Sequence, residues 1–183
     1  MRYFFYLAAM RSHNGMRPQD IVILLKIITF PQGAAWKVTD LAASVYLSQS
    51  EVSESLNRSQ LAGLLDAPKK KVMRLSLMEF LEYGLHYVFP QHPGALVRGI
   101  PTAHSHPFLK KKIVSEDVYV WPDADGTVRG QAIEPLTKSV PKAVKEDEQL
   151  YKLLALTDVI RVGKTRELKI ALQELKQMIL NGA

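Results

Sequence analysis

The chain has 183 residues, of which 47% are hydrophobic and 23% charged, and this length is sufficient to bury a hydrophobic core. It contains no cysteine, which excludes disulfide bridges, thiolate zinc sites and cysteine nucleophiles. Lysine and arginine (24) exceed aspartate and glutamate (18), and the net charge of +6 favours a polyanionic partner such as nucleic acid. A cytoplasmic location fits these properties, and no segment approaches the roughly 20 apolar residues of a membrane span.

Residues 1–15 form the first distinct segment. The apolar stretch 1–10 resembles the core of a secretory signal, but it is short and Arg11 follows where a small-residue cleavage site is expected. Two other interpretations stay open: a first strand or helix that packs on the body, or an upstream start codon with Met16 as the true first residue. We expect residues 1–15 to be an N-terminal extension that is partly non-native.

Residues 18–33 predict a first helix. Pro18 suits the first helical turn, and Asp20 is favourable at the positive end of the helix dipole. Apolar side chains recur at helical spacing and mark one inward face: Ile21, Leu24, Leu25 and Ile28. Pro31 and Gly33 are expected to end the helix.

Residues 38–63 predict two further short helices joined by a brief turn. Thr39 is expected to cap the first of them, and Ser48 with Glu51 forms the S-x-x-E capping box of the other, which ends near Gly63. Their shared core consists of apolar residues on facing sides: Leu41, Val45, Leu47, Val52 and Leu56. Ala42 or Ala43 leaves room for a close crossing of the two helices.

The middle of the chain predicts less regular structure. Ser76 is expected to cap a fourth helix, which Gly84 ends early in an alternative interpretation. Prolines disfavour helix between residues 89 and 107 and favour an extended connector: Pro90, Pro93, Pro101 and Pro107. Residues 118–121 and 127–128, on either side of a turn at 122–126, predict a β-hairpin.

Two helices are expected at the C-terminus. One begins near Glu146 and is broken by Gly163, and the other carries apolar residues at helical spacing: Leu168, Leu172, Leu175 and Ile179. Their apolar stripes are expected to need a partner surface. The predicted fold is therefore α+β and mainly α, with the extension (1–15), an N-terminal helical domain (16–88), and a second region (89–183) holding the connector, the hairpin and the C-terminal helices.

Polar side chains on the outer face of the third helix are the main functional signal. They are of the kinds that form hydrogen bonds to base edges in a DNA groove: Gln49, Ser50, Ser53, Glu54, Asn57 and Arg58. Ser48, Gln49 and Ser50 lie at the helix N-terminus, where hydroxyls and backbone amides can bind a phosphate. This pattern favours binding of double-stranded DNA.

The segment from Leu41 to Leu56 resembles the winged helix-turn-helix superfamily, in particular regulators of the MarR and ArsR type. The resemblance rests on Leu41 and Ala42, on residues 45–48 (Val-Tyr-Leu-Ser) and 50–53 (Ser-Glu-Val-Ser), and on Leu56; it extends over residues 17–75. The sequence departs from the pattern at Tyr46, where these families often place glycine. The resemblance implies an N-terminal winged helix-turn-helix whose second helix of the pair lies in the major groove.

The resemblance also implies a β-wing after the recognition helix. Residues 64–74 would be this wing, with phosphate contacts made by basic side chains: Lys69, Lys70, Lys71 and Arg74. A plain basic loop around Pro68 is the alternative. Either structure would neutralise phosphates.

Other candidate sites have simpler interpretations. His104 and His106, with His86 and His92 upstream, match no zinc-ligand spacing and are expected on a surface loop. Residues 123–126 (Asp-Ala-Asp-Gly) begin like a calcium loop without its bidentate acid, so a hairpin turn is expected. The basic run 110–112 (Lys110, Lys111 and Lys112) is expected on a solvated edge or as an extension of the DNA-binding surface. No metal or cofactor is expected.

The sequence thus predicts a cytoplasmic, DNA-binding transcriptional regulator without enzymatic activity, because no nucleophile, base and anion hole converge. Self-association to a homodimer through the C-terminal helices is expected, since helix-turn-helix proteins often bind two-fold sites. The alternative is an antitoxin-like or accessory module of a two-gene defence or toxin system, whose C-terminal part binds a partner protein.

Overall fold

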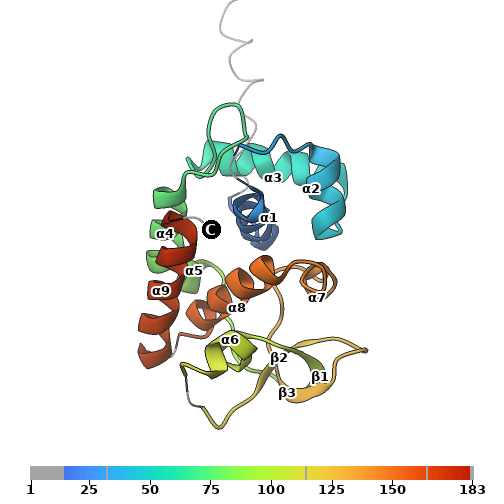
Figure 1. Cartoon of the computed structure of the whole chain (residues 1–183), viewed down its shortest axis with the longest axis vertical. Helices are drawn as coiled ribbons and strands as arrows, with labels where there is room; N and C mark the ends of the chain where they lie inside the picture. Colours follow the sequence, from blue (N-terminus) through green and yellow to red (C-terminus); the bar gives the residue numbers. More distant parts are fainter. Residues whose placement is uncertain (1–14, 32, 114, 164, 182–183) are drawn as a thin grey trace, which may run out of the picture.

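The computed structural model describes residues 15–31, 33–113, 115–163 and 165–181. The fold is α+β and mainly helical, as the sequence predicts, with a small β-sheet at one end of the molecule (Figure 1). The expectations for residues 1–14 lie outside the described residues. No helix in the described ranges combines the length and the apolar character needed to cross a membrane.

The first half of the chain is helical. Its helices are α1 (Pro18–Thr29), α2 (Val38–Val45), α3 (Gln49–Leu61), α4 (Arg74–Tyr83) and α5 (Leu85–Val88). The prediction of Pro18 in the first turn of α1 is confirmed, and so is the capping box of α3. Thr39 and Ser76 do not cap their helices, because α2 begins one residue earlier, at Val38, and α4 already begins at Arg74.

The second half of the chain combines strands and helices. Its elements are β1 (Leu96–Pro101), the 3₁₀ helix η1 (Ala103–Ser105), α6 (Pro107–Lys110), β2 (Tyr119–Pro122), β3 (Val128–Ala132), α7 (Val140–Ala143), α8 (Glu148–Val162) and α9 (Thr165–Leu180). Gly163 ends α8 in the left-handed conformation (φ 79°), which confirms the predicted break between the two terminal helices. The short helix α7 is not predicted by the sequence pattern.

The three strands close into a small barrel in which β2 and β3 run parallel to each other. The predicted β-hairpin between them is therefore wrong. Each of the two strands pairs antiparallel with β1 instead, so that Ile100 lies opposite Trp121 and Val97 lies opposite Gly130. The pairing needs close backbone approach at Gly99, where an added Cβ would lie 1.9 Å from the Trp121 carbonyl oxygen.

The buried side chains form one continuous core that extends across the predicted boundary at residues 88 and 89. Helix α8 lies at its centre and contacts α1, α5, α9 and η1 (Figure 1). The apolar stripe of α9 is covered within the molecule, since Leu175 and Ile179 are buried in contacts with α8 and α4. The partner surface that the apolar stripe of α9 was expected to need is thus supplied within the chain, by α4 and α8.

Candidate nucleic-acid interface

The connection between α2 and α3 is a tight turn at Tyr46, Leu47 and Ser48. Tyr46 adopts the left-handed conformation (φ 54°, ψ 44°), which is the geometry that glycine provides most easily. A non-glycine residue there costs about 1–2 kcal/mol. Contacts of the Tyr46 side chain offset this cost, because its hydroxyl donates to Glu146 and the Lys142 ammonium lies 4.0 Å from its ring centre.

Helix α3 exposes its polar face to solvent along its length. Every side chain of this face that was predicted from the sequence, apart from Arg58, is exposed: Ser48, Gln49, Ser50, Ser53, Glu54 and Asn57. Val52 and Leu56 point the other way and are buried against the core. Helix α3 lies along one end of the molecule, opposite the end that holds α6 and the barrel (Figure 1).

Arg58 does not belong to this exposed face. Its Nε and Nη2 donate to the two carboxylate oxygens of Asp20 at 2.9 and 2.6 Å, and the pair is buried between α1 and α3. The bidentate contact raises the pKa of the Arg58 guanidinium. Arg58 thus forms a structural ion pair with Asp20, and its sequence-based assignment to base recognition is corrected.

Two acidic side chains on α3 are also engaged locally. Glu51 accepts hydrogen bonds from the backbone amide and the hydroxyl of Ser48, and these bonds lower the pKa of its carboxyl. Glu54 lies 3.8 Å from the Arg58 guanidinium. The lowered pKa favours the charged form of Glu51, so this face keeps negative charge beside its neutral polar groups.

A turn closed by a single β-bridge, here called the basic hairpin (residues 64–73), follows α3. Leu65 and Val72 form an antiparallel bridge, and the Met73 amide donates to the Leu64 carbonyl at 2.9 Å. The Asp66 carboxylate accepts the amides of Lys70 and Lys71 and fixes the tip. The structure assigns one isolated β-bridge and no strand to residues 64–73, which is intermediate between the β-wing and the plain basic loop considered from the sequence.

The lysines of the basic hairpin differ in their contacts. Lys69 donates to the Asn57 side chain and links the hairpin to α3. Lys70 donates to the Trp36 carbonyl at 3.0 Å and lies 4.3 Å from the centre of the Trp36 ring. Lys71 is exposed, and its ammonium group has no partner among the described residues.

Arg74 was predicted from the sequence to lie on the wing, but it is the first residue of α4. Its Nη1 donates to the carbonyl oxygen of Ile179, near the end of α9. The run Lys110, Lys111 and Lys112 also lies away from α3, beside α6 at the opposite end of the molecule (Figure 1). The run therefore does not extend the α3 surface.

The two histidines expected on a surface loop are buried. His104 contacts Glu167 at 3.1 Å and the Asp117 carbonyl at 2.9 Å. His106 is 1% exposed; its Nδ1 accepts the Phe108 amide, and its Nε2 has no partner among the described residues. Among the residues that the structure describes, no cluster of three or more histidine or acidic residues could hold a metal ion.

A buried network around Asp158 was not foreseen from the sequence. Its carboxylate accepts hydrogen bonds from the Thr102 hydroxyl, the Trp121 indole and the Arg161 guanidinium, at 2.8, 2.6 and 2.6 Å. Complete burial raises the pKa of the Asp158 carboxyl, and the charge of Arg161 opposes that rise. The partners come from β2, α8 and the end of β1, so the network fastens the barrel to α8 and is structural.

No family model, no curated protein and no solved structure matches this chain.

Proposed function

We propose that the protein binds double-stranded DNA through a winged helix-turn-helix formed by α2, α3 and the basic hairpin, and that it regulates transcription. In this proposal α3 is the recognition helix and the basic hairpin is the wing. The exposed polar face of α3 is the observation that carries the proposal. Its side chains are free of core packing, and no other element covers them in the described structure.

The residues divide into two roles by their chemistry. Gln49, Ser53 and Asn57 present amide and hydroxyl groups that can pair with base edges, so they would determine sequence preference. Ser50 at the helix N-terminus, with Lys69 and Lys71 on the hairpin, would bind phosphates and position the helix. Because Lys69 donates to Asn57, hairpin and helix present one connected surface.

The first prediction separates these two roles. Duplexes selected from a random pool should be bound more tightly than scrambled ones, and Gln49→Ala or Asn57→Ala should reduce that discrimination by about 1–3 kcal/mol. Lys71→Gln should weaken the binding of selected and scrambled duplexes alike. It should also reduce the steepness of the plot of log affinity against log salt by about 0.9. Fluorescence anisotropy over a range of salt concentrations measures both effects.

Lys110→Gln is the matched control, since it removes the same charge from an exposed lysine at the opposite end of the molecule. It should change the salt dependence far less than Lys71→Gln. If the α3 and hairpin variants bind the selected duplex as tightly as the wild type, α3 is not the DNA-binding element.

Protein–protein interaction is a second candidate function, which one observation favours. Leu75 near the start of α4 and Tyr83 at its end are 71% and 70% exposed, and Tyr87 on α5 is 81% exposed. Exposed large apolar side chains that gather on neighbouring elements mark interaction surfaces. A second copy of the chain is the occupant that fits the proposed regulator, because helix-turn-helix proteins commonly bind DNA as dimers.

The second prediction concerns this α4–α5 surface. Light scattering coupled to size exclusion should give twice the chain mass for the wild type. Leu75→Lys and Tyr87→Lys should each give the monomer mass, because a charge buried in an apolar interface is costly. A wild-type protein that is monomeric at micromolar concentration would contradict the hypothesis of a homodimer through this surface.

A further inference from the structure

Two identical tripeptides pair with each other in the barrel. Residues 97–99 on β1 and residues 128–130 on β3 both have the sequence Val-Arg-Gly. In the antiparallel register Arg98 lies directly opposite Arg129, and each valine lies opposite the glycine of the other tripeptide. The two arginines are therefore at the centre of a locally symmetric strand pair.

Both arginine side chains project from the same face of this strand pair. Directly opposite residues of an antiparallel ladder share a face, whereas their neighbours along each strand point to the other face. On that other face the backbone is close: as at Gly99, a Cβ added at Gly130 would collide, 2.5 Å from the Val118 carbonyl oxygen. Arg98 and Arg129 are both exposed. The glycine face is thus closed by neighbouring backbone, and the arginine face is open to solvent.

No carboxylate among the described residues forms an ion pair with either arginine. An acidic turn follows β2, but its link to Arg98 is through the backbone, since the Asp123 amide donates to the Arg98 carbonyl at 3.2 Å. The carboxylates of Asp123 and Asp125 lie 3.1 and 3.8 Å from the Lys145 ammonium instead. Like charges directly opposite each other in a ladder destabilise the pairing. An external anion bound between the two guanidinium groups would relieve this repulsion.

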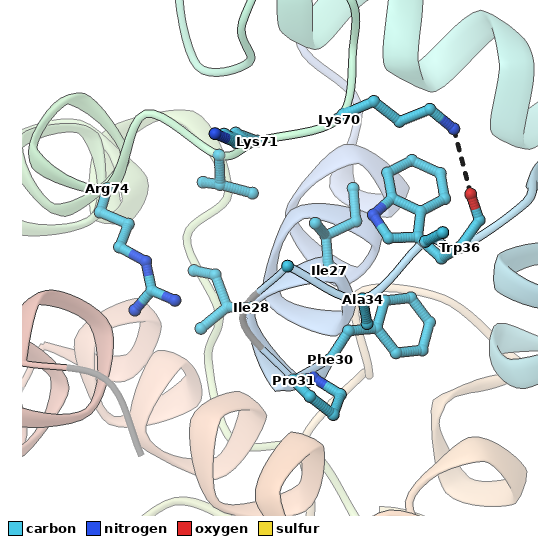
Figure 2. Close-up of a pocket in the computed structure, with 12 residues that line it drawn as sticks. Ile27, Ile28, Phe30, Pro31, Ala34, Trp36, Lys70, Lys71 and Arg74 are labelled. Atoms are coloured by element: carbon cyan, nitrogen blue, oxygen red, sulfur yellow. Dashed lines mark hydrogen bonds between the residues drawn. The ribbon is translucent and has the colours of Figure 1, made fainter.

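The chemistry of the pair suits a phosphate group in an extended polyanion. A guanidinium group can donate two parallel hydrogen bonds to a phosphate, and it stays charged at neutral pH. Neither arginine lines the cleft between the end of α1 and the basic hairpin (Figure 2) or the smaller cleft beside Phe108. Because the pair stands on an open strand face, it fits a backbone that lies across the surface better than a small enclosed ligand.

We propose that Arg98 and Arg129 form a second phosphate-binding site, which binds the sugar–phosphate backbone of double-stranded DNA without reading its sequence. The barrel and α3 lie at opposite ends of the molecule (Figure 1), so this site is separate from the α3 surface. The identity of the polyanion as DNA rests on the proposed function, whereas the anion-binding arginine pair does not.

Fluorescence anisotropy with a short scrambled duplex at low salt tests the site. Arg98→Gln with Arg129→Gln should weaken the binding of this duplex by about tenfold and make the salt dependence less steep. Arg166→Gln with Lys169→Gln is the matched control, because it removes two exposed positive charges from α9. The control should stay within about twofold of the wild type. No loss in the arginine variant, or an equal loss in the control, overturns the site.

Thermal unfolding without DNA tests the repulsion between the two arginines. Arg129→Glu places opposite charges across the ladder, so its melting temperature should exceed that of the wild type. Its affinity for the scrambled duplex should fall at least as far as that of the double glutamine variant. A melting temperature of Arg129→Glu at or below that of the wild type overturns the uncompensated pair.

Calorimetry with inorganic phosphate separates a DNA site from a site for a free anion. Submillimolar phosphate binding that Arg98→Gln abolishes, together with an unchanged duplex affinity of that variant, overturns DNA as the occupant. The α3 surface is tested by its own variants. If Gln49→Ala, Asn57→Ala and Lys71→Gln leave duplex binding unchanged while the arginine variant weakens it, the proposed function fails and the second site stands.

Discussion

Arg58→Ala is expected to destabilise the protein by about 3–5 kcal/mol, because it leaves the Asp20 carboxylate buried without its cation. Asp20 is 0% exposed and has both oxygens occupied by Arg58, while one of them also accepts the Arg17 amide. The loss is measured as the free energy of unfolding in urea. An effect of this size is a large part of the stability of an ordinary domain.

The double variant Asp20→Ala with Arg58→Ala is the control for this prediction. Removing both charges eliminates the uncompensated carboxylate, so the double variant should be more stable than Arg58→Ala alone. A different result is expected if Arg58 contacts bases instead of forming a structural pair with Asp20. If Arg58→Ala unfolds like the wild type and only relaxes DNA sequence preference, Arg58 reads bases and the buried pair is not structural.

The second large effect is a dependence of stability on pH that originates at His106. Burial lowers the pKa of this imidazole from 6.5 to about 4. Between these two values the unfolded chain binds a proton that the folded chain does not. The free energy of unfolding should therefore decrease as pH falls through this window, by about 1.4 kcal/mol per pH unit and about 3 kcal/mol in total.

His106→Asn isolates this contribution. The asparagine oxygen can replace Nδ1 as acceptor of the Phe108 amide, as in a helix N-cap, while the titrating group is removed. Urea unfolding from about pH 7 to about pH 4 should show a smaller loss of stability for the variant than for the wild type. Identical losses in both proteins would show that His106 does not cause the dependence.

Local sequence signals predicted the helical part of the fold well. Pro18, the pair Ser48 and Glu51, and Gly163 act within one turn of the helix ends that they define, so their effect can be inferred from a few neighbouring residues. The exposed face of α3 follows in the same way from helical periodicity, because Val52 and Leu56 fix which side is buried.

These local signals could not predict the contacts between segments that are distant in the sequence. Arg58 has the spacing of the polar face of α3, and only the position of Asp20, 38 residues earlier, shows that it points inward. The strands β2 and β3 have the composition of a hairpin, and only β1 explains why they lie parallel. His104 and His106 are polar and lie between Pro101 and Pro107, yet tertiary packing buries both.

The cleft beside the basic hairpin could not be inferred from the sequence for the same reason. Its aromatic and basic sides come from the end of α1, the α1–α2 connection and the hairpin, which the fold brings together around Trp36. The sequence predicts Lys70 and Arg74 to be phosphate ligands because they are basic. Their contacts with Trp36 and Ile179 depend on tertiary structure and cannot be inferred from the sequence.

Site-specific photo-crosslinking tests most directly whether α3 is the surface that meets DNA. A benzophenone amino acid replaces Ser53 on α3 in one protein and Gln173 on α9 in another, both at exposed positions. With a duplex at low salt, we expect crosslinks to DNA from position 53 and none above background from position 173. Crosslinks from position 173 with none from position 53 would contradict the assignment of α3 to DNA binding.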